Sequence, residues 1–299
     1  MRSIYHIAFF TVIIFCASLT AVQSKAQLKV TRKMIQKERI QRTLLGVKLR
    51  PRVGALLAEV EKLYGKKVQA EFANISESPE GDDTAGRAMI SDDGTPMVKI
   101  DSHIGPGDGA RVERIMAHEL LHLRLRATGY PTLFFHGETG LMTSFGPYLL
   151  AAGNTLCNGL EHRMFAPEMR AMGFDPGEEI KHGLEKFREA GRTGQGDDVL
   201  LALYYYRAIL EYEDPKLLAR LRQGYVEGDR LGIIKLSESL AQIVIKGKPH
   251  TPHDVAKTLL TCLDTLFQKL MVFTLLPPTA KVSGAVSLQR VNLQVTRGQ

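Results

Sequence analysis

His118, Glu119 and His122 are the residues of this 299-residue chain whose types and spacing most clearly indicate chemistry. They lie in a segment with helical periodicity, where positions four apart are one turn apart, so both imidazoles face the same side and can bind one metal ion. The carboxylate of Glu119 projects beside them, where it can accept a proton from a water on the metal. The pattern therefore predicts a metal centre on a helix, with a general base next to it.

A catalytic metal held by two histidines needs a third protein ligand. Asn154, Asn158 and Glu161 recur at spacings of four and three, which makes a polar stripe on an otherwise apolar segment. A buried metal site would account for such a stripe, and a stripe that faces solvent is the alternative. We expect Glu161 to be the third ligand, with Asn158 in a hydrogen bond behind it. His162, the next residue, is the alternative ligand or lies behind the ligands like Asn158.

The segments before the motif predict a small α+β unit that positions the histidine helix. That helix is expected to begin after the N-cap Asp108 and to run to Thr128, where Gly129 and Pro131 end it. Ahead of it, apolar spacing and turn signals predict a helix at 51–64, a strand at 68–72 and a hairpin of strands at 87–90 and 96–101.

After the histidine helix, the sequence is helical almost throughout. A glycine-rich loop at 131–146 precedes a helix at 147–166, and a terminal strand is expected near 282–295. Thr251 and Asp254 form a capping box at the start of the last helix. The further predicted helices span residues 177–190, 197–212, 214–222, 229–246 and 251–271.

A helix, a small sheet whose last strand precedes an H-E-x-x-H helix, and a second helix that carries a glutamate resemble a minimal gluzincin-type zinc metallopeptidase, that is, a zincin. The resemblance covers about residues 51–175, and beyond the motif it rests on the segment Asn158-x-x-Glu161-His162. It implies an α+β fold with a zincin-like metallopeptidase domain at 51–174. The resemblance does not reach the residues after that domain, where helical periodicity predicts an all-helical region at 175–299. The implied Zn²⁺ ligands are His118, His122 and Glu161, with Glu119 as the catalytic base.

Three further points bear on the resemblance. In this family the strand before the histidine helix commonly binds extended substrate along its edge, which here implies Pro96–Asp101. Arg124 departs from the family pattern, because zincins usually carry an apolar residue two positions after the second histidine. His136 and Tyr148 are the nearest candidates for a second group that stabilises a developing oxyanion.

The amino terminus has the pattern of a secretory signal peptide. Arg2 precedes the apolar stretch Ile4–Ala21, and Ser24 and Ala26 place small residues at a cleavage site. Residues 1–26 are therefore expected to be removed, with a retained anchor as the alternative. The mature protein is then secreted or periplasmic.

A basic arm at residues 27–50 follows the signal. Residues 27–52 contain nine lysines and arginines against one acid, Glu38, while the whole chain carries a formal charge of +7. Such an arm can contact an anionic envelope surface, or it can be a solvated helix or leader. Aromatic residues do not alternate with its basic ones, so no nucleic-acid partner is expected.

Composition sets the outer limits on function. The chain is 44% hydrophobic and 24% charged, which is ordinary for a globular protein and excludes a disordered or collagen-like chain. Three cysteines are too few for a disulfide framework; Cys157 and Cys262 remain after signal removal, either bridged or as two thiols. After residue 25 no apolar run is long enough to span a bilayer, which excludes a polytopic membrane protein.

These observations predict a zinc-dependent peptidase that hydrolyses a peptide bond of a peptide or protein substrate. Glu119 would act as its general base. The alternative is a non-catalytic envelope protein in which the metal site is structural or vestigial and the helical half binds a partner.

Overall fold

The computed structural model describes residues 43–75, 85–212, 214–268, 270–276, 279–283 and 286–298. The predicted signal peptide and most of the basic arm lie outside these residues. The last part of the arm forms a two-stranded hairpin of β1 (Thr43–Leu44) and β2 (Val47–Lys48). Its turn residues Leu45 and Gly46 both have positive φ, as a type I′ turn requires. Within the described ranges, no helix is long and apolar enough to cross a membrane.

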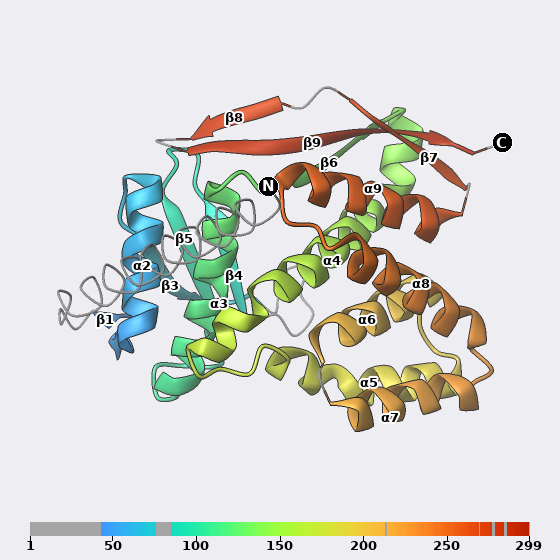
Figure 1. The fold of residues 1–299 in the computed structure, drawn as a ribbon, viewed down its shortest axis with the longest axis horizontal. Coiled ribbons are helices and arrows are strands. Elements are labelled where there is room, and N and C mark those ends of the chain that lie inside the picture. Colours follow the sequence, from blue (N-terminus) through green and yellow to red (C-terminus); the bar gives the residue numbers. More distant parts are fainter. Residues whose placement is uncertain are drawn as a thin grey trace, which may run out of the picture.

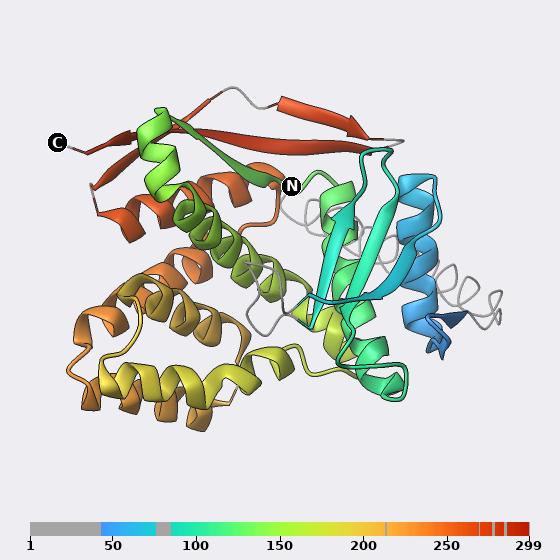
Figure 2. The same ribbon diagram turned by 180° about the vertical axis from the view of Figure 1, so that it is seen from behind.

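The front of the molecule is the predicted α+β unit. Helix α3 contacts α2, the sheet and α4, so it lies at the centre of this part (Figures 1 and 2). Its N-cap Asp108 accepts a hydrogen bond from the backbone N–H of Arg111, which confirms the predicted start. The elements are α2 (Pro51–Tyr64), β3 (Gln69–Ala73), β4 (Gly86–Ile90), β5 (Pro96–Asp101) and α3 (Gly109–Ala127).

The three strands of this unit run in the order β3-β5-β4. Strand β5 is parallel to β3 and antiparallel to β4, so both of its edges are paired. The expectation that Pro96–Asp101 offers a free edge to substrate is therefore wrong. Within the described residues β4 is an edge strand, and it packs against α3.

The segment after α3 differs from its prediction. Strand β6 (Thr132–Gly137) occupies part of the expected loop, and α4 (Thr139–Ala171) begins eight residues before Pro147. Strand β6 pairs in parallel with β9 (Val286–Arg297), with Thr132 opposite Arg290. A partner so distant in sequence leaves no local signal, which explains why the strand was missed.

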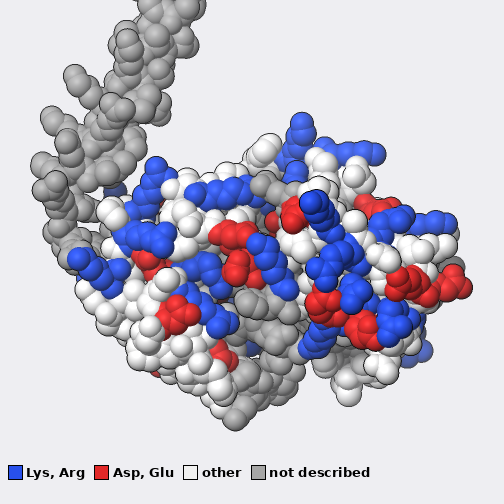
Figure 3. Space-filling view, turned by 90° about the horizontal axis from the view of Figure 1, so that it is seen from below, with Lys and Arg blue, Asp and Glu red and all other residues white. Residues whose placement is uncertain are grey.

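The helices of the second half confirm their predictions in number and approximate position. Thr251 and Asp254 form the expected capping box. The helices are α5 (Glu178–Thr193), α6 (Asp198–Glu211), α7 (Pro215–Glu227), α8 (Leu231–Gly247) and α9 (Pro252–Phe267). Helices α5 and α7 lie at the bottom of Figure 1, and the view from below shows charges of both signs on the surface (Figure 3). Within α5, Glu185 pairs with Arg188 at 2.8 Å.

The prediction of an all-helical carboxy-terminal region is wrong. After α9 the chain forms β7 (Met271–Leu275), β8 (Thr279–Ser283) and the long β9, which pairs with β7, β8 and β6 and runs along the top of Figure 1. The predicted terminal strand is thus confirmed as β9. The fold is α+β, mostly helical, with small mixed sheets.

Helix α4 contributes to two apolar cores. Phe165 and Met169 near its end pack with α2, α3 and the β3-β5-β4 sheet. Leu149 and Leu156 in its middle pack with α8, α9 and the sheet of β6, β7 and β9. A third core joins α5 to α8 and contains Tyr204 and Tyr205. The rotation of α4 about its own axis is therefore restricted both in its middle and near its end.

Both described cysteines are free thiols, on α4 and α9. Burial raises the pKa of Cys262 to about 12. At pH 8 only about one molecule in ten thousand would then carry the reactive thiolate. In a Cys157→Ser variant of the chain from residue 27, we expect Cys262 to resist a disulfide reagent at pH 8 until guanidinium unfolds the protein. Reaction of the native variant at the unfolded rate would contradict the buried position.

Candidate metal centre

Three buried histidines converge where α3 meets α4. His118 and His122 come from successive turns of α3, His162 comes from α4, and each is no more than 5% exposed. The Nε2 atom of His122 lies 3.1 Å from Nε2 of His118 and 3.1 Å from Nε2 of His162. One ligand atom from each ring lies within 4.8 Å of the others, so the cluster could hold a metal ion.

The spacing of these nitrogens matches a tetrahedral ion. With metal–nitrogen bonds of about 2.05 Å, neighbouring ligand atoms in a tetrahedron lie about 3.3 Å apart. The two separations from His122, each 3.1 Å, are close to that value. One cation could therefore be held by all three histidines, whose ligand atoms lie within 4.8 Å of one another.

Carboxylates behind two of the rings orient them. His122 Nδ1 lies 2.6 Å from Oε2 of Glu161, and His162 Nδ1 lies 2.9 Å from Oε1 of Glu211. A carboxylate can only accept, so each Nδ1 carries its proton and donates it outward. The lone pair of each Nε2 then faces into the cluster, which is the tautomer that a metal needs.

Glu211 is itself held by an arginine. Arg207, one turn earlier on α6, places Nε 2.7 Å from Oε1 and Nη2 3.3 Å from Oε2 of Glu211. Nη2 also lies 3.3 Å from His162 Nδ1, but the shorter carboxylate contact assigns the proton to that nitrogen. Burial raises the pKa of Glu211, and the positive charge of Arg207 opposes that rise. The arginine thus helps to keep this buried carboxylate ionised.

Burial also keeps His162 neutral. It lowers the pKa of His162 well below the ordinary 6.5, and the nearby Arg207 and His122 lower it further. A neutral imidazole is the form that binds a metal.

The structure assigns different positions to the two candidates for the third ligand. His162 brings its Nε2 to the inside of the cluster. Glu161, the expected ligand, instead contacts the outer nitrogen of His122. Asn158 is half-buried and Asn154 is exposed, so the polar stripe of α4 turns from solvent toward the site along its length.

Glu119 is buried against the edge strand. A β-carbon on Gly86 of β4 would lie 3.0 Å from Oε1 of Glu119, 3.1 Å from its Cγ and only 2.4 Å from Cγ2 of Ile115. Glycine is therefore required here by the close approach of β4 to α3. In the sequence, Gly86 is simply a glycine that follows an acidic segment. Nothing there indicates that it lies against Glu119, so sequence reasoning missed it.

Phe165 forms an apolar wall of the site. Its ring centroid lies 5.1 Å from that of His122 and 5.3 Å from those of His118 and His162. It lies one turn after Glu161 and His162 on α4 and belongs to the first core. Packing against one aromatic ring limits rotation of all three imidazoles.

Arg124 has a structural role that explains its departure from the zincin pattern. Its Nη1 lies 2.8 Å from Oε1 of Glu168 on α4 and 3.6 Å from Oε2 of Glu59 on α2. The guanidinium thus joins three helices beside the site. Its charge is met by these two carboxylates and is directed away from the histidines.

The two candidates for an oxyanion donor have other contacts. His136 Nε2 lies 3.0 Å from Oδ1 of Asn292 on β9, and the hydroxyl of Tyr148 donates to Asp197 at the start of α6. Neither of these contacts is with the histidine cluster.

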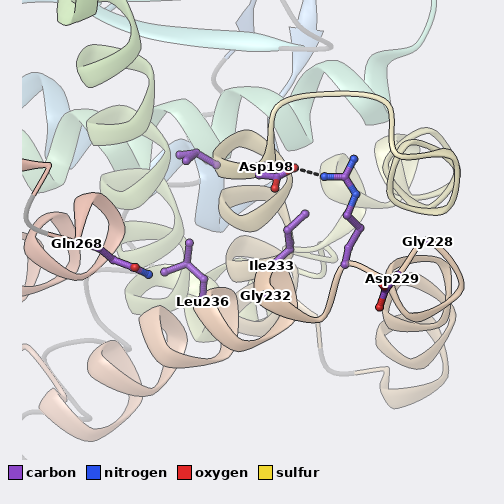
Figure 4. Close-up of a pocket in the computed structure, with 9 residues that line it drawn as sticks. Asp198, Gly228, Asp229, Gly232, Ile233, Leu236 and Gln268 are labelled. Carbon is purple, nitrogen blue, oxygen red and sulfur yellow. Dashed lines mark hydrogen bonds and ion pairs between the residues drawn. The ribbon is translucent and has the colours of Figure 1, made fainter.

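A hollow of about 540 Å³, separate from the histidine cluster, lies among α6, α8 and Gln268 (Figure 4). Arg230 at its wall forms an ion pair with Asp198, which neutralises the cation. The rest of its lining is small, apolar or amide side chains and Asp229. The hollow holds no histidine or cysteine, so the histidine cluster is the better candidate for chemistry.

No protein-family model, curated protein or solved structure matches the chain. The geometry of the histidine cluster is therefore the observation that bears on function.

The packing at Gly86 gives a prediction for stability. Gly86→Ala should lower the free energy of unfolding by about 1–3 kcal/mol, because the added carbon overlaps Ile115 and Glu119. Gly107→Ala is the matched control, since a β-carbon there meets no atom within 4 Å. Urea unfolding of the two variants measures the difference. Equal stability of Gly86→Ala and the wild type would contradict the close approach of β4 to α3.

Proposed function

We propose that this chain is a zinc-dependent peptidase of the zincin type that works after export, as a secreted or periplasmic protein. The observation that carries the proposal is the convergence of three imidazole Nε2 atoms, two of them from the helix that also carries Glu119. In the proposal Zn²⁺ is bound by His118, His122 and His162. Glu161 and Glu211 orient two of these ligands from outside.

The number of ligands supports a catalytic site. Structural zinc sites usually have four protein ligands, often cysteines, whereas catalytic sites have three and keep one position for water or substrate. The cluster found among the described residues contains three. Its donors are all imidazoles, which suit zinc and other borderline metals.

The residues of this chain would divide the chemistry between them. Zn²⁺, when bound, would activate a water and polarise the scissile carbonyl. Glu119 accepts the proton of the attacking water on its carboxylate and passes it to the nitrogen of the leaving amine. Phe165 and the surrounding core exclude bulk water, which strengthens the electrostatic contacts within the site.

The edge of β4 is the proposed place for the substrate backbone. The N–H of Asp101 donates to the carbonyl of Ala85, so this pair is bonded within the sheet. In an antiparallel ladder the next residue and every second one after it point their backbone groups outward. The N–H and C=O of Gly86 and the N–H of Ala88 therefore face a peptide that lies along β4, next to Glu119, while the C=O of Ala88 accepts a hydrogen bond from Arg126.

Deep burial of the three histidines favours the second candidate, a non-catalytic envelope protein with a structural metal. The two functions differ in what Glu119 does. A structural site needs the three imidazoles but not this carboxylate as a base.

Replacement of the base separates the two functions. In the mature chain from residue 27, Glu119→Gln should keep about one zinc per chain and lose roughly 10²–10⁴-fold in turnover of a peptide. Elemental mass spectrometry and a fluorogenic peptide assay measure the two quantities, and His122→Ala, which should lose the metal, is the control. Peptide cleavage by Glu119→Gln at the wild-type rate would rule out its role as the base. Zinc without any cleavage by the wild type would favour the structural site.

The proposed ligand set has its own test. His162→Ala should abolish stoichiometric zinc binding, because it removes a ligand. Glu161→Gln and Glu211→Gln should weaken zinc binding by roughly 10–100-fold, because they loosen a ligand that stays in place. Competition with a chelator measures the affinities. Loss of all zinc in Glu161→Gln, with retention of zinc in His162→Ala, would instead identify Glu161 as the third ligand.

A further inference from the structure

Arg126 lies one helical turn beyond His122 on α3, at the end of the proposed site. Its Nη1 donates to the carbonyl of Ala88 at 2.9 Å. That carbonyl belongs to one of the outward-facing residues of the β4 edge, on the alternation that starts from Ala85. The arginine therefore reaches the strand edge on which the substrate backbone is proposed to lie.

The surroundings of Arg126 differ from those of its neighbour Arg124. Arg124 is neutralised by Glu168 and Glu59. Arg126 is half-buried, and within the described ranges no carboxylate forms an ion pair with it. One of its five N–H donors is used on Ala88, which leaves the edge formed by Nε and Nη2 for a planar acceptor. A carboxylate fits that edge with two parallel hydrogen bonds.

The positions of Gly86 and Ala88 along β4 determine how far Arg126 lies from the proposed base Glu119. Gly86 lies against Glu119, and Ala88, two residues along β4, lies at Arg126. Successive residues of a paired peptide advance by about 3.4 Å. A substrate that pairs with β4 therefore passes Arg126 about two residues from the bond that is cut.

We propose that Arg126 is a specificity-determining residue that binds a carboxylate of the peptide substrate about two residues from the scissile bond. This inference rests on the proposed peptidase function. The carboxylate is either the side chain of an aspartate or glutamate or the free carboxy terminus of the peptide.

The test is a cleavage profile of the zinc-loaded mature protein on a peptide mixture, read by mass spectrometry. Acidic residues should be enriched about two positions from the cut, and a matched pair of peptides with Asp or Asn at that position should differ by roughly 10–100-fold in kcat/KM. Arg126→Gln should remove this difference mainly through KM, because the contact is the same in ground and transition states. A second mixture with amidated carboxy termini distinguishes the two sources, since only recognition of the free terminus is lost there.

Arg111→Gln is the matched control, because Arg111 is an exposed arginine at the other end of α3 and should leave the profile unchanged. Arg126→Lys keeps the positive charge but loses the two parallel N–H donors of the guanidinium, so it should retain a reduced preference for the carboxylate. Cleavage by the wild type that depends neither on an acidic residue nor on a free carboxy terminus, or an unchanged preference in Arg126→Gln, would overturn the inference and leave the peptidase proposal standing. No cleavage by the zinc-loaded wild type would overturn both. The wild-type profile alone decides the matter if Arg126→Gln does not fold.

Discussion

The orientation of buried imidazoles by buried carboxylates is the constraint on which the site depends. Three rings in one apolar region can turn their Nε2 lone pairs toward one point only if something accepts the proton on the opposite nitrogen. Glu161 does this for His122, and Glu211 does it for His162. A buried carboxylate needs compensation in turn, and Arg207 provides it for Glu211. The contacts that orient the candidate metal site therefore extend through α4 to α6.

This chain of contacts explains why the helical half of the molecule matters to the α+β half. Helix α6 packs against α4 where Gly159 allows the ring of Tyr206 to approach; a β-carbon at Gly159 would lie 2.7 Å from that ring. The hydroxyl of Tyr206 donates to the carbonyl of Leu156 on α4. The close packing of the two helices brings the Arg207–Glu211 pair to His162. A change in the second core that moves α6 against α4 would therefore also change the position of Glu211 relative to His162.

Local signals were enough to predict the front of the fold and the motif. The N-cap of Asp108 and the breakers at Gly129 and Pro131 place α3 almost to the residue, and the spacing of His118 and His122 needs only the period of a helix. Strand β6 and the central position of β5 could not be predicted in this way, because each depends on a pairing with a distant segment. Glu211 and Gly86 were missed for the same reason: their relation to the site is one of packing.

The sequence by itself determined which side chains share one face of α3, since helical geometry alone brings His118 and His122 together beside Glu119. Only the tertiary structure decided between Glu161 and His162 for the inner position. Adjacent residues of a helix point about 100° apart. Here His162 brings its Nε2 to the inside of the cluster, and Glu161 meets the outer nitrogen of His122. The rotation of α4 about its axis selects between them. That rotation is determined by two separate cores, one around Phe165 and one around Leu156, whose contacts come from segments far away in the chain.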